Sequence, residues 1–300
     1  MHFLFAIYKY FPFGGLQNDL LRIAEAATVR GHSIDIYTTS WEGPQPGSNG
    51  KISIHLVHSA GCSNQGRMSS FAKMMSKILA ETKHDVSVAF NRLPGFNWYF
   101  AADDCLACRL PQRHSKLVLA CHPRYRTLLD MERAVFHSSP RTQIMYISEQ
   151  QKKDFCEAYH VRESRFHCLP PGMNPRCVRP AEEKAQALRV LKRQELGLSD
   201  NDFVIIIIGN NLRLKGADRI VRAVEHLPAE YRLKCHLLFA GALDKTLTAG
   251  ASPDIHIHQL GQRQDVPELL LAADLMVHPA RQEAAGSVLI EGLASGLPVI

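Results

Sequence analysis

The chain has 300 residues, of which 46% are hydrophobic and 21% are charged, and its formal net charge is +6. This composition is typical of a folded globular protein, and the length is enough for two domains of about 150 residues each. The longest strictly aliphatic run, Val204–Ile208, is far shorter than the roughly 20 residues of a membrane-spanning helix. The apolar run His2–Tyr8 lacks a preceding basic segment, so it predicts a buried strand and not a signal peptide, and we expect a cytoplasmic protein.

The eight cysteines do not form a recognisable metal-binding or disulfide pattern. Only Cys105 and Cys108 make a CxxC pair, and a structural zinc ion needs four ligands, for which no second pair follows at a suitable spacing. A redox pair at a helix N-terminus is the alternative. We expect eight reduced thiols in a reducing compartment.

The first half of the chain alternates predicted strands and helices, which favours a Rossmann-like domain over residues 1–169. Ser148 is the expected N-cap of the last of these helices. A G-x-G-x-x-G pattern is absent after the first strand and a Walker A sequence is absent throughout, which weakens the dehydrogenase and kinase interpretations. The predicted strands are Phe3–Tyr8, Ser33–Thr38, Ile52–Val57, Val86–Phe90, Lys116–Cys121, Ile144–Ile147 and Arg165–Leu169, and the predicted helices are Leu16–Arg30, Met68–Thr82, Arg126–His137 and Glu149–Tyr159.

A proline-rich break from Pro170 to Pro175 predicts a linker over residues 170–180. A second domain is expected over residues 181–300, and its continuous apolar strand Phe203–Ile208 is typical of a parallel sheet covered on both faces. The other predicted elements are the strands Cys235–Ala240, 255–260 and Asp274–His278 and the helices Ala181–Leu196, Ala217–His226, Val266–Ala273 and one that begins near Ala285 and Gly286.

Glu283 precedes the predicted start of this last helix, and Glu291 follows it. Their spacing would put them about 80° apart around a single helix, so we place Glu283 in the loop and Glu291 inside the helix. The unpaired amides of Gly286, Ser287 and Val288, with the helix dipole, make an anion site. A diphosphate with a sugar at each end, which is a nucleotide sugar, fits this layout. The simpler alternative is an amphipathic helix with two solvated glutamates.

Basic residues are concentrated between Leu106 and Phe136, where the acidic residues are Asp130 and Glu132. Such a patch attracts an anionic membrane surface or a phosphorylated acceptor. Nucleic acid is a weaker interpretation because the patch lacks a recognised nucleic-acid motif, and an ordinary solvated face is the remaining alternative. The basic residues are Arg109, Arg113, Lys116, Arg124, Arg126 and Arg133.

The stretch Glu-Ala-Ala-Gly-Ser-Val-Leu-Ile-Glu at 283–291, followed by Gly-Leu-Pro-Val, resembles the Glu-x7-Glu motif of retaining glycosyltransferases of the GT-B fold. The resemblance extends nearly end to end and is strongest to the lipopolysaccharide core glucosyltransferases. It implies an α/β protein with two Rossmann-like domains facing across a cleft. Further segments that carry it are 8–17, 90–91, 99–103, 169–172 and 278–280.

The resemblance implies transfer of glucose from UDP-glucose to a heptose of the inner core, with retention of configuration and without a metal cofactor. Glu283 would position sugar hydroxyls and Glu291 would bind the ribose. Leu214 occupies the place of an arginine that is common in the family, and Arg213 lies one residue earlier. The other implied donor contacts are Gly15, Lys215, Arg263 and the amides of Gly286, Ser287 and Val288, while Asp19 and Asp103 would line the first domain's side.

The resemblance also implies a phosphorylated lipopolysaccharide acceptor, no nucleic acid, and a peripheral location on the inner face of the inner membrane. Relative to the family, the chain ends at Ile300 just inside a strand, so we expect a second domain that is incomplete at its C-terminal end. Two alternatives to the transferase are a nucleotide-sugar epimerase of the same fold and an inactive nucleotide-sugar-binding fragment.

Overall fold

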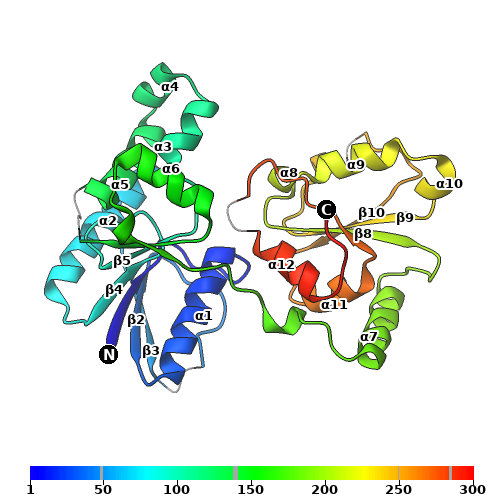
Figure 1. The fold of residues 1–300 in the computed structure, drawn as a ribbon, viewed down its shortest axis with the longest axis horizontal. Helices are drawn as coiled ribbons and strands as arrows, with labels where there is room; N and C mark the ends of the chain where they lie inside the picture. The colour runs from blue at the N-terminus through cyan, green and yellow to red at the C-terminus, as the bar shows by residue number, and fades with distance from the viewer. Residues whose placement is uncertain (48–49, 138–140, 249, 284–285) are drawn as a thin grey trace. The chain divides into compact units, whose positions relative to one another are not determined.

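The structure is a computed structural model that describes residues 1–47, 50–137, 141–248, 250–283 and 286–300. It divides into two compact units, Met1–Pro170 (unit 1) and Pro171–Ile300 (unit 2) (Figure 1). The segment 171–180, which we predicted as a linker, is grouped with unit 2. Within the described residues no helix is both long enough and apolar enough to cross a membrane.

Unit 1 is built on a seven-stranded sheet in the order β3-β2-β1-β4-β5-β6-β7. Every neighbouring pair is parallel. The strand order reverses between β1 and β4, and ligands of open α/β sheets bind at the carboxyl ends of the strands near such a switch point. The strands are β1 (His2–Ala6), β2 (Ser33–Thr38), β3 (Ile52–Leu56), β4 (Val86–Ala89), β5 (Trp98–Ala101), β6 (Gln143–Tyr146) and β7 (Phe166–Cys168).

All four helices predicted in unit 1 are present, but helix α3 and strand β5 were not predicted, and one predicted strand is a helix. Ser148 caps α6 as expected, since its side chain accepts a hydrogen bond from the Gln151 amide. The segment Lys116–Cys121, predicted as a strand, is a helix because the Ser115 hydroxyl accepts a hydrogen bond from the Val118 amide at 3.4 Å and caps it. The helices are α1 (Gly15–Val29), α2 (Asn64–Glu81), α3 (Leu106–Arg109), α4 (Lys116–Cys121), α5 (Pro123–His137) and α6 (Glu149–Tyr159), with short 3₁₀ turns η1 (Leu110–Gln112) and η2 (Glu163–Arg165).

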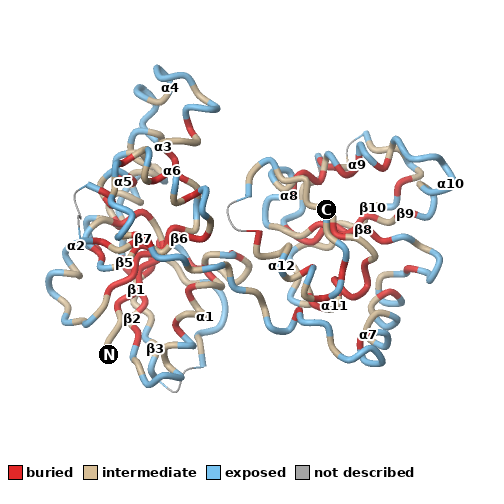
Figure 2. The backbone as a smooth tube through the Cα atoms, viewed as in Figure 1, coloured by how far each residue is buried: buried red, intermediate tan, exposed pale blue. Residues whose placement is uncertain are grey.

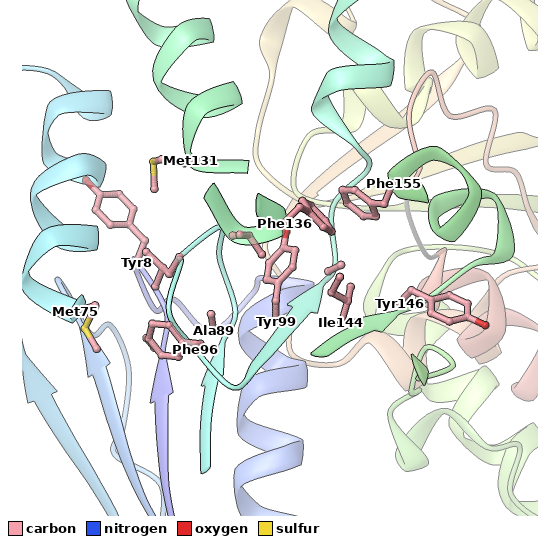
Figure 3. Packing of buried hydrophobic residues seen from close by; sticks show 14 of the residues in the cluster. Tyr8, Met75, Ala89, Phe96, Tyr99, Met131, Phe136, Ile144, Tyr146 and Phe155 are labelled. Atoms are coloured by element: carbon pink, nitrogen blue, oxygen red, sulfur yellow. The ribbon is translucent and has the colours of Figure 1, made fainter. Parts of the chain in front are cut away.

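Aromatic side chains fill the core between this sheet and the helices α2, α5 and α6 (Figure 3). Phe136 of α5 stacks on Tyr159 of α6, with ring centroids 4.7 Å apart. Phe136 also meets Phe155 at 4.8 Å and Tyr99 of β5 at 6.4 Å. The buried aromatic area holds both helices on the sheet and so fixes the residues that precede and follow them.

Unit 2 is built on a four-stranded parallel sheet in the order β10-β9-β8-β11. The predicted strands Phe203–Ile208 (β8) and Cys235–Ala240 (β9) have the predicted bounds, and both are largely buried (Figure 2). The last strand of this unit is shorter than the predicted strand Asp274–His278. The other strands are β10 (His256–Gly261) and β11 (Leu275–Met276), and the helices are α7 (Glu182–Glu195), α8 (Leu212–Lys215), α9 (Ala217–Glu225), α10 (Ala229–Arg232), α11 (Val266–Ala272) and α12 (Ser287–Ala294), with 3₁₀ turns η3 (Pro175–Cys177) and η4 (Lys245–Leu247).

Candidate active site

In unit 2 a lysine, a histidine and a glutamate meet beyond the carboxyl ends of β8 and β11. Asn211 caps the short helix α8, because its side chain accepts a hydrogen bond from the Leu214 amide at 3.1 Å. Lys215, in the last turn of α8, places its Nζ 2.7 Å from Oε2 of Glu283. The same oxygen lies 2.7 Å from Nε2 of His278, which follows β11. The structure therefore brings two predicted site residues, Lys215 and Glu283, into direct contact and adds His278, which we had not predicted as a site residue.

The environment of Glu283 keeps it ionised. Partial burial by itself raises the pKa of this carboxyl, but hydrogen bonds from His278 and Lys215, the charge of Lys215 and a backbone hydrogen bond from Gly286 lower the pKa to about 2. The His278 side chain is only 3% exposed, and its Nδ1 is buried without a hydrogen-bond partner in the described part of the chain. The cluster thus holds a fixed negative charge beside a cation.

The loop that carries Glu283 is held tightly against α8 and α9. Gly216 has φ +89°, and a Cβ at this position would collide with the carbonyl oxygen of Pro279. Arg219 donates to that same oxygen at 3.0 Å. Arg281 forms a bidentate ion pair with Asp218, in which Nη1 and Nη2 each donate to one carboxylate oxygen at 2.6 Å. Only glycine allows so close an approach in this backbone conformation, so Gly216 positions the His278–Glu283 loop.

The predicted anion site at the start of α12 is only partly open. Gly286 caps the helix with φ 61°, and its backbone already bonds the Glu283 carboxylate. The amides of Ser287 and Val288 donate to no acceptor among the residues that the structure describes. The prediction of three unpaired amides is therefore corrected to two, because the third is taken by the glutamate beside it.

Three other predicted donor contacts have partners within unit 2. Oε1 of Glu291 accepts a hydrogen bond from the Asn174 amide at 3.0 Å. Arg213 donates to the Thr246 hydroxyl at 2.7 Å. Arg263 binds Asp265 through both Nε and Nη2, at 2.7 and 2.5 Å, and this hydrogen bonding lowers the pKa of Asp265. Each of these three side chains would have to exchange a partner to reach a ligand.

In unit 1, Asp103 belongs to a charged network that the sequence did not reveal. Arg92, which follows β4, donates to Asp103 at 3.0 Å and to Glu132 of α5 at 2.8 Å. Glu132 is fully buried and also accepts hydrogen bonds from the amides of Leu106 and Ala107, both at 3.0 Å. The Asp103 side chain is 61% exposed, so the network holds this carboxylate on one side and leaves it accessible on the other.

The remaining predicted residues of unit 1 lie at the start of α1. Gly15 is the first residue of this helix, and a Cβ there would meet nothing within 4 Å. A Cβ at Gly14 would instead collide with the Gln17 side chain. Asp19 lies one turn later, with its Oδ1 3.8 Å from Arg22. The space beside Gly15 is therefore open, whereas Gly14 serves local packing.

The predicted basic patch surrounds α4, which extends away from the sheet of unit 1 (Figure 1). Arg113, Lys116, Arg124 and Arg126 are exposed, while Arg109 is half-buried and pairs with Asp104 at 3.6 Å. Leu117 is 72% exposed beside them. Lys116 and Leu117 lie side by side on this short helix, while Arg113 precedes it and Arg124 and Arg126 lie in α5. Exposed apolar and basic side chains next to each other are typical of a surface that contacts lipid.

The cysteines and carboxylates in the described ranges do not gather as a metal site would require. Within the described residues no group of three or more His, Cys, Asp and Glu side chains is placed to hold a metal ion. All eight cysteines are free thiols, including Cys105 and Cys108 of the CxxC pair. Burial, together with the nearby Glu132, raises the pKa of Cys105, which makes it a poor nucleophile.

Two Rossmann-like units, one of them carrying a lysine, a glutamate and free helix amides beyond its strands, define a glycosyltransferase of the GT-B type. Comparison with family models agrees. The model of Glycosyltransferase Family 4 matches residues 13–176, and the model of Glycosyl transferases group 1 matches residues 189–300. The chain belongs to this glycosyltransferase family and is a glycosyltransferase.

Among its relatives, the chain is 37% identical to the lipopolysaccharide glucosyltransferase WaaG of Escherichia coli K12, over 99% of this chain and 79% of that protein. It superposes on a crystal structure of WaaG with a TM-score of 0.91 and 35% identity, covering 99% of this chain and 80% of the other. The Anabaena protein Alr3699/HepE, solved with UDP and glucose, shares the fold with a TM-score of 0.68 at 18% identity, over 100% of this chain and 80% of that one. These comparisons do not favour the epimerase alternative.

Proposed function

We propose that this glycosyltransferase moves glucose from UDP-glucose to a heptose of the lipopolysaccharide inner core, with retention of anomeric configuration. The support comes from the relative named a lipopolysaccharide glucosyltransferase. The observation that carries the proposal is the cluster in unit 2, where Lys215 and His278 both lie 2.7 Å from one oxygen of Glu283. Such a site can bind a diphosphate and sugar hydroxyls at once.

In the proposed reaction the departing UDP gathers negative charge on its diphosphate. Lys215 would exchange Glu283 for a phosphate oxygen, and the amides of Ser287 and Val288 would donate to the same group. This positive charge comes from the protein itself, and we therefore propose that the reaction needs no metal. Arg213 and Arg263 would add to it only after leaving their present partners.

Glu283 would hold hydroxyls of the transferred glucose, since an ionised carboxylate accepts hydrogen bonds strongly. Glu291 would bind the ribose of the nucleotide. Retention follows if the acceptor attacks from the face that UDP leaves, with a phosphate oxygen taking the acceptor's proton. We propose that Asp103, Asp19 and Gly15 of unit 1 also contact a substrate.

We further propose that the basic patch around α4 attaches the protein to the anionic inner face of the inner membrane. Juxtaposed exposed leucine and basic side chains support a peripheral attachment. The attached enzyme would then bind its phosphorylated acceptor at the membrane surface.

The test is incubation with radiolabelled UDP-glucose and a heptose-terminated core acceptor, in parallel with the Glu283→Ala variant. Transfer of label by the wild-type protein in the presence of a chelator, with a loss of about 10²-fold or more in the variant, would support the proposal. Consumption of no UDP-sugar by the wild-type chain would contradict it.

A further inference from the structure

A cavity of about 250 Å³ opens beyond the carboxyl ends of β1, β2 and β3 in unit 1. None of its lining residues has been given a role above. Each of the three strands contributes residues just after its end, and the fourth side is formed by the first turn of α2. The lining side chains that matter here are Lys9, Thr39, Ser40, His58, Ser59 and Arg67.

The lining is positively charged and contains no carboxylate. Lys9, His58 and Arg67 are all exposed. Within the described part of the chain, neither the Lys9 ammonium nor the Arg67 guanidinium forms an ion pair. This contrasts with Arg92 and Arg263, whose charges are neutralised by neighbouring carboxylates. Two cations and a histidine that line one cavity, without an ion-pair partner among the described residues, attract an anion.

The first wall of the cavity is fixed before any ligand arrives. The Thr39 amide donates to the Tyr8 carbonyl at 3.0 Å, and the Tyr10 amide donates to the Ser40 carbonyl at 2.9 Å, which extends the pairing of β1 with β2. Tyr10 stacks on Trp41 with ring centroids 3.7 Å apart and planes 12° apart. The loops that present Lys9 and Ser40 are therefore held in register.

The opposite wall is held by side chains of α2 and of the loop before it. The Ser59 hydroxyl donates to the carbonyl of Arg67 at 3.1 Å. The Ala60 amide donates to the Ser70 hydroxyl at 3.1 Å, and Ser63 caps α2. A preorganised site loses less free energy on binding than one that must order its loops first.

We propose that this cavity is a subsite for an oxyanion, a phosphate or a carboxylate, carried by the acceptor saccharide. Its volume suits one charged sugar group, and its concave shape distinguishes it from the protruding helix α4 proposed to meet lipid. Lys9 and Arg67 would pair with the anion, and the Ser40 hydroxyl would donate to it. The inference rests on the proposed transferase function, which supplies the acceptor.

The first test measures binding to the full chain by calorimetry, with glucose 6-phosphate, glucuronate and neutral glucose as probes. We expect at least one of the two charged probes to bind, glucose to bind far more weakly, and Lys9→Ala or Arg67→Ala to weaken that binding about 10-fold. Lys73→Ala removes a charge from an exposed position of the same helix and should leave it unchanged. The tighter charged probe identifies the oxyanion.

Three results would overturn the inference in this assay, and the first two are equal binding of the charged probe to the wild type and Arg67→Ala, and glucose binding as tightly as the charged probes. Absence of binding by both charged probes would also overturn it. These outcomes do not depend on turnover. Failure of the wild-type chain to transfer any sugar would count against the proposed function alone.

The second test uses turnover and separates the acceptor from lipid. For Arg67→Ala we expect the KM for the lipopolysaccharide acceptor to rise about 10-fold while the KM for the donor stays unchanged. Removing the acceptor's phosphates or reducing its carboxyls should abolish this difference for whichever group is recognised. The variant should sediment with anionic vesicles like the wild type, and loss of sedimentation would place the anion on a lipid head group and contradict the inference.

Discussion

Each unit holds a glutamate against a cation, and the two pairs differ in how fully they are enclosed. Glu132 in unit 1 is 0% exposed and accepts from Arg92, two backbone amides and the Tyr159 hydroxyl. Glu283 in unit 2 has a side chain that is 27% exposed and lies in a loop. The first carboxylate is surrounded by donors and cannot exchange them, whereas the second can exchange Lys215 for a ligand.

Burial and the number of hydrogen-bond donors around a carboxylate distinguish a structural charge from a functional one. A buried ion pair with every lone pair satisfied contributes to a single fixed arrangement, and breaking it leaves a charge without solvent. The Lys215–Glu283 pair is partly exposed and lies near unpaired amides, so separating its two charges costs little free energy. Glu132 ties α5 to the start of α3, while Glu283 holds the Lys215 ammonium and also bonds the Gly286 backbone at the start of α12.

The largest expected effect is that of Glu132→Ala on stability. Removing this carboxylate leaves the buried Arg92 guanidinium without its main partner, and we expect a loss of about 3–5 kcal/mol in the free energy of unfolding of unit 1. Asp130→Ala changes an exposed acid on the same helix that pairs with Arg133 at 3.2 Å, and should cost less than about 1 kcal/mol. Urea titration followed by circular dichroism measures both losses. Equal losses for the two variants would contradict the structural role of Glu132.

A smaller loss is expected from Gly216→Ala, because a side chain there would displace the Pro279 carbonyl and strain a φ of +89°. Gly197→Ala is the matched control, since its φ is +69° but its added Cβ would meet nothing within 4 Å. We expect Gly216→Ala to cost roughly 1–3 kcal/mol more than the control and to lower transfer activity by displacing Glu283. Similar unfolding midpoints for the two variants would show that the loop is not held as described.

The pH dependence of stability sharpens the description of Glu283. Its pKa is lowered from 4.5 to about 2, so the ionised carboxylate stabilises the fold above pH 4.5, and this contribution is lost as the pH falls from 4.5 towards 2. The difference in unfolding free energy between the wild type and Glu283→Gln should therefore be constant above about pH 5 and should shrink below it. Denaturant titrations at several pH values measure this, and a difference that grows on acidification would refute the assignment.

The smallest effect is expected at the membrane patch. Removing one exposed charge, as in Lys116→Ala, should weaken partition onto anionic vesicles by about 1 kcal/mol, and Leu117→Ser should weaken it further by removing apolar contact. Lys184→Ala in unit 2 removes an equal charge and serves as the control. Cosedimentation with vesicles of anionic and neutral lipid is the measurement, and equal effects of Lys116→Ala and Lys184→Ala would exclude a local patch.

Much of the fold could be predicted from hydrophobic patterning. The bounds of two strands, Phe203–Ile208 and Cys235–Ala240, were predicted as observed. A short, continuous apolar run is typical of a strand that is buried on both faces of a parallel sheet. Lys116–Cys121 was predicted wrongly as a strand. Its Leu-Val-Leu run has the composition of a buried strand, but Leu117 and Val118 are exposed. The N-cap at Ser115 favours the helix instead.

The candidate site was predicted only in part, because contacts between distant residues leave no local pattern. Lys215 was named from a resemblance and Glu283 from the spacing around the helix start together with that resemblance, and the structure adds that the two side chains touch. Glu132 could not be distinguished in the sequence from an exposed helix acid, since its partner Arg92 lies 40 positions earlier. His278 could have been predicted as a site residue, because it ends the predicted strand Asp274–His278 at the edge where α/β sheets bind ligands.

The donor site in unit 2 is tested most directly by the binding of UDP to the full chain, measured by calorimetry for the wild type, Lys215→Ala and Lys184→Ala. If the Lys215–Glu283 cluster is the donor site, Lys215→Ala weakens UDP binding by about 10-fold or more, because a charged contact to the diphosphate is lost. Lys184→Ala should bind UDP as the wild type does. Equal affinity of Lys215→Ala and the wild type for UDP would contradict the assignment of this cluster.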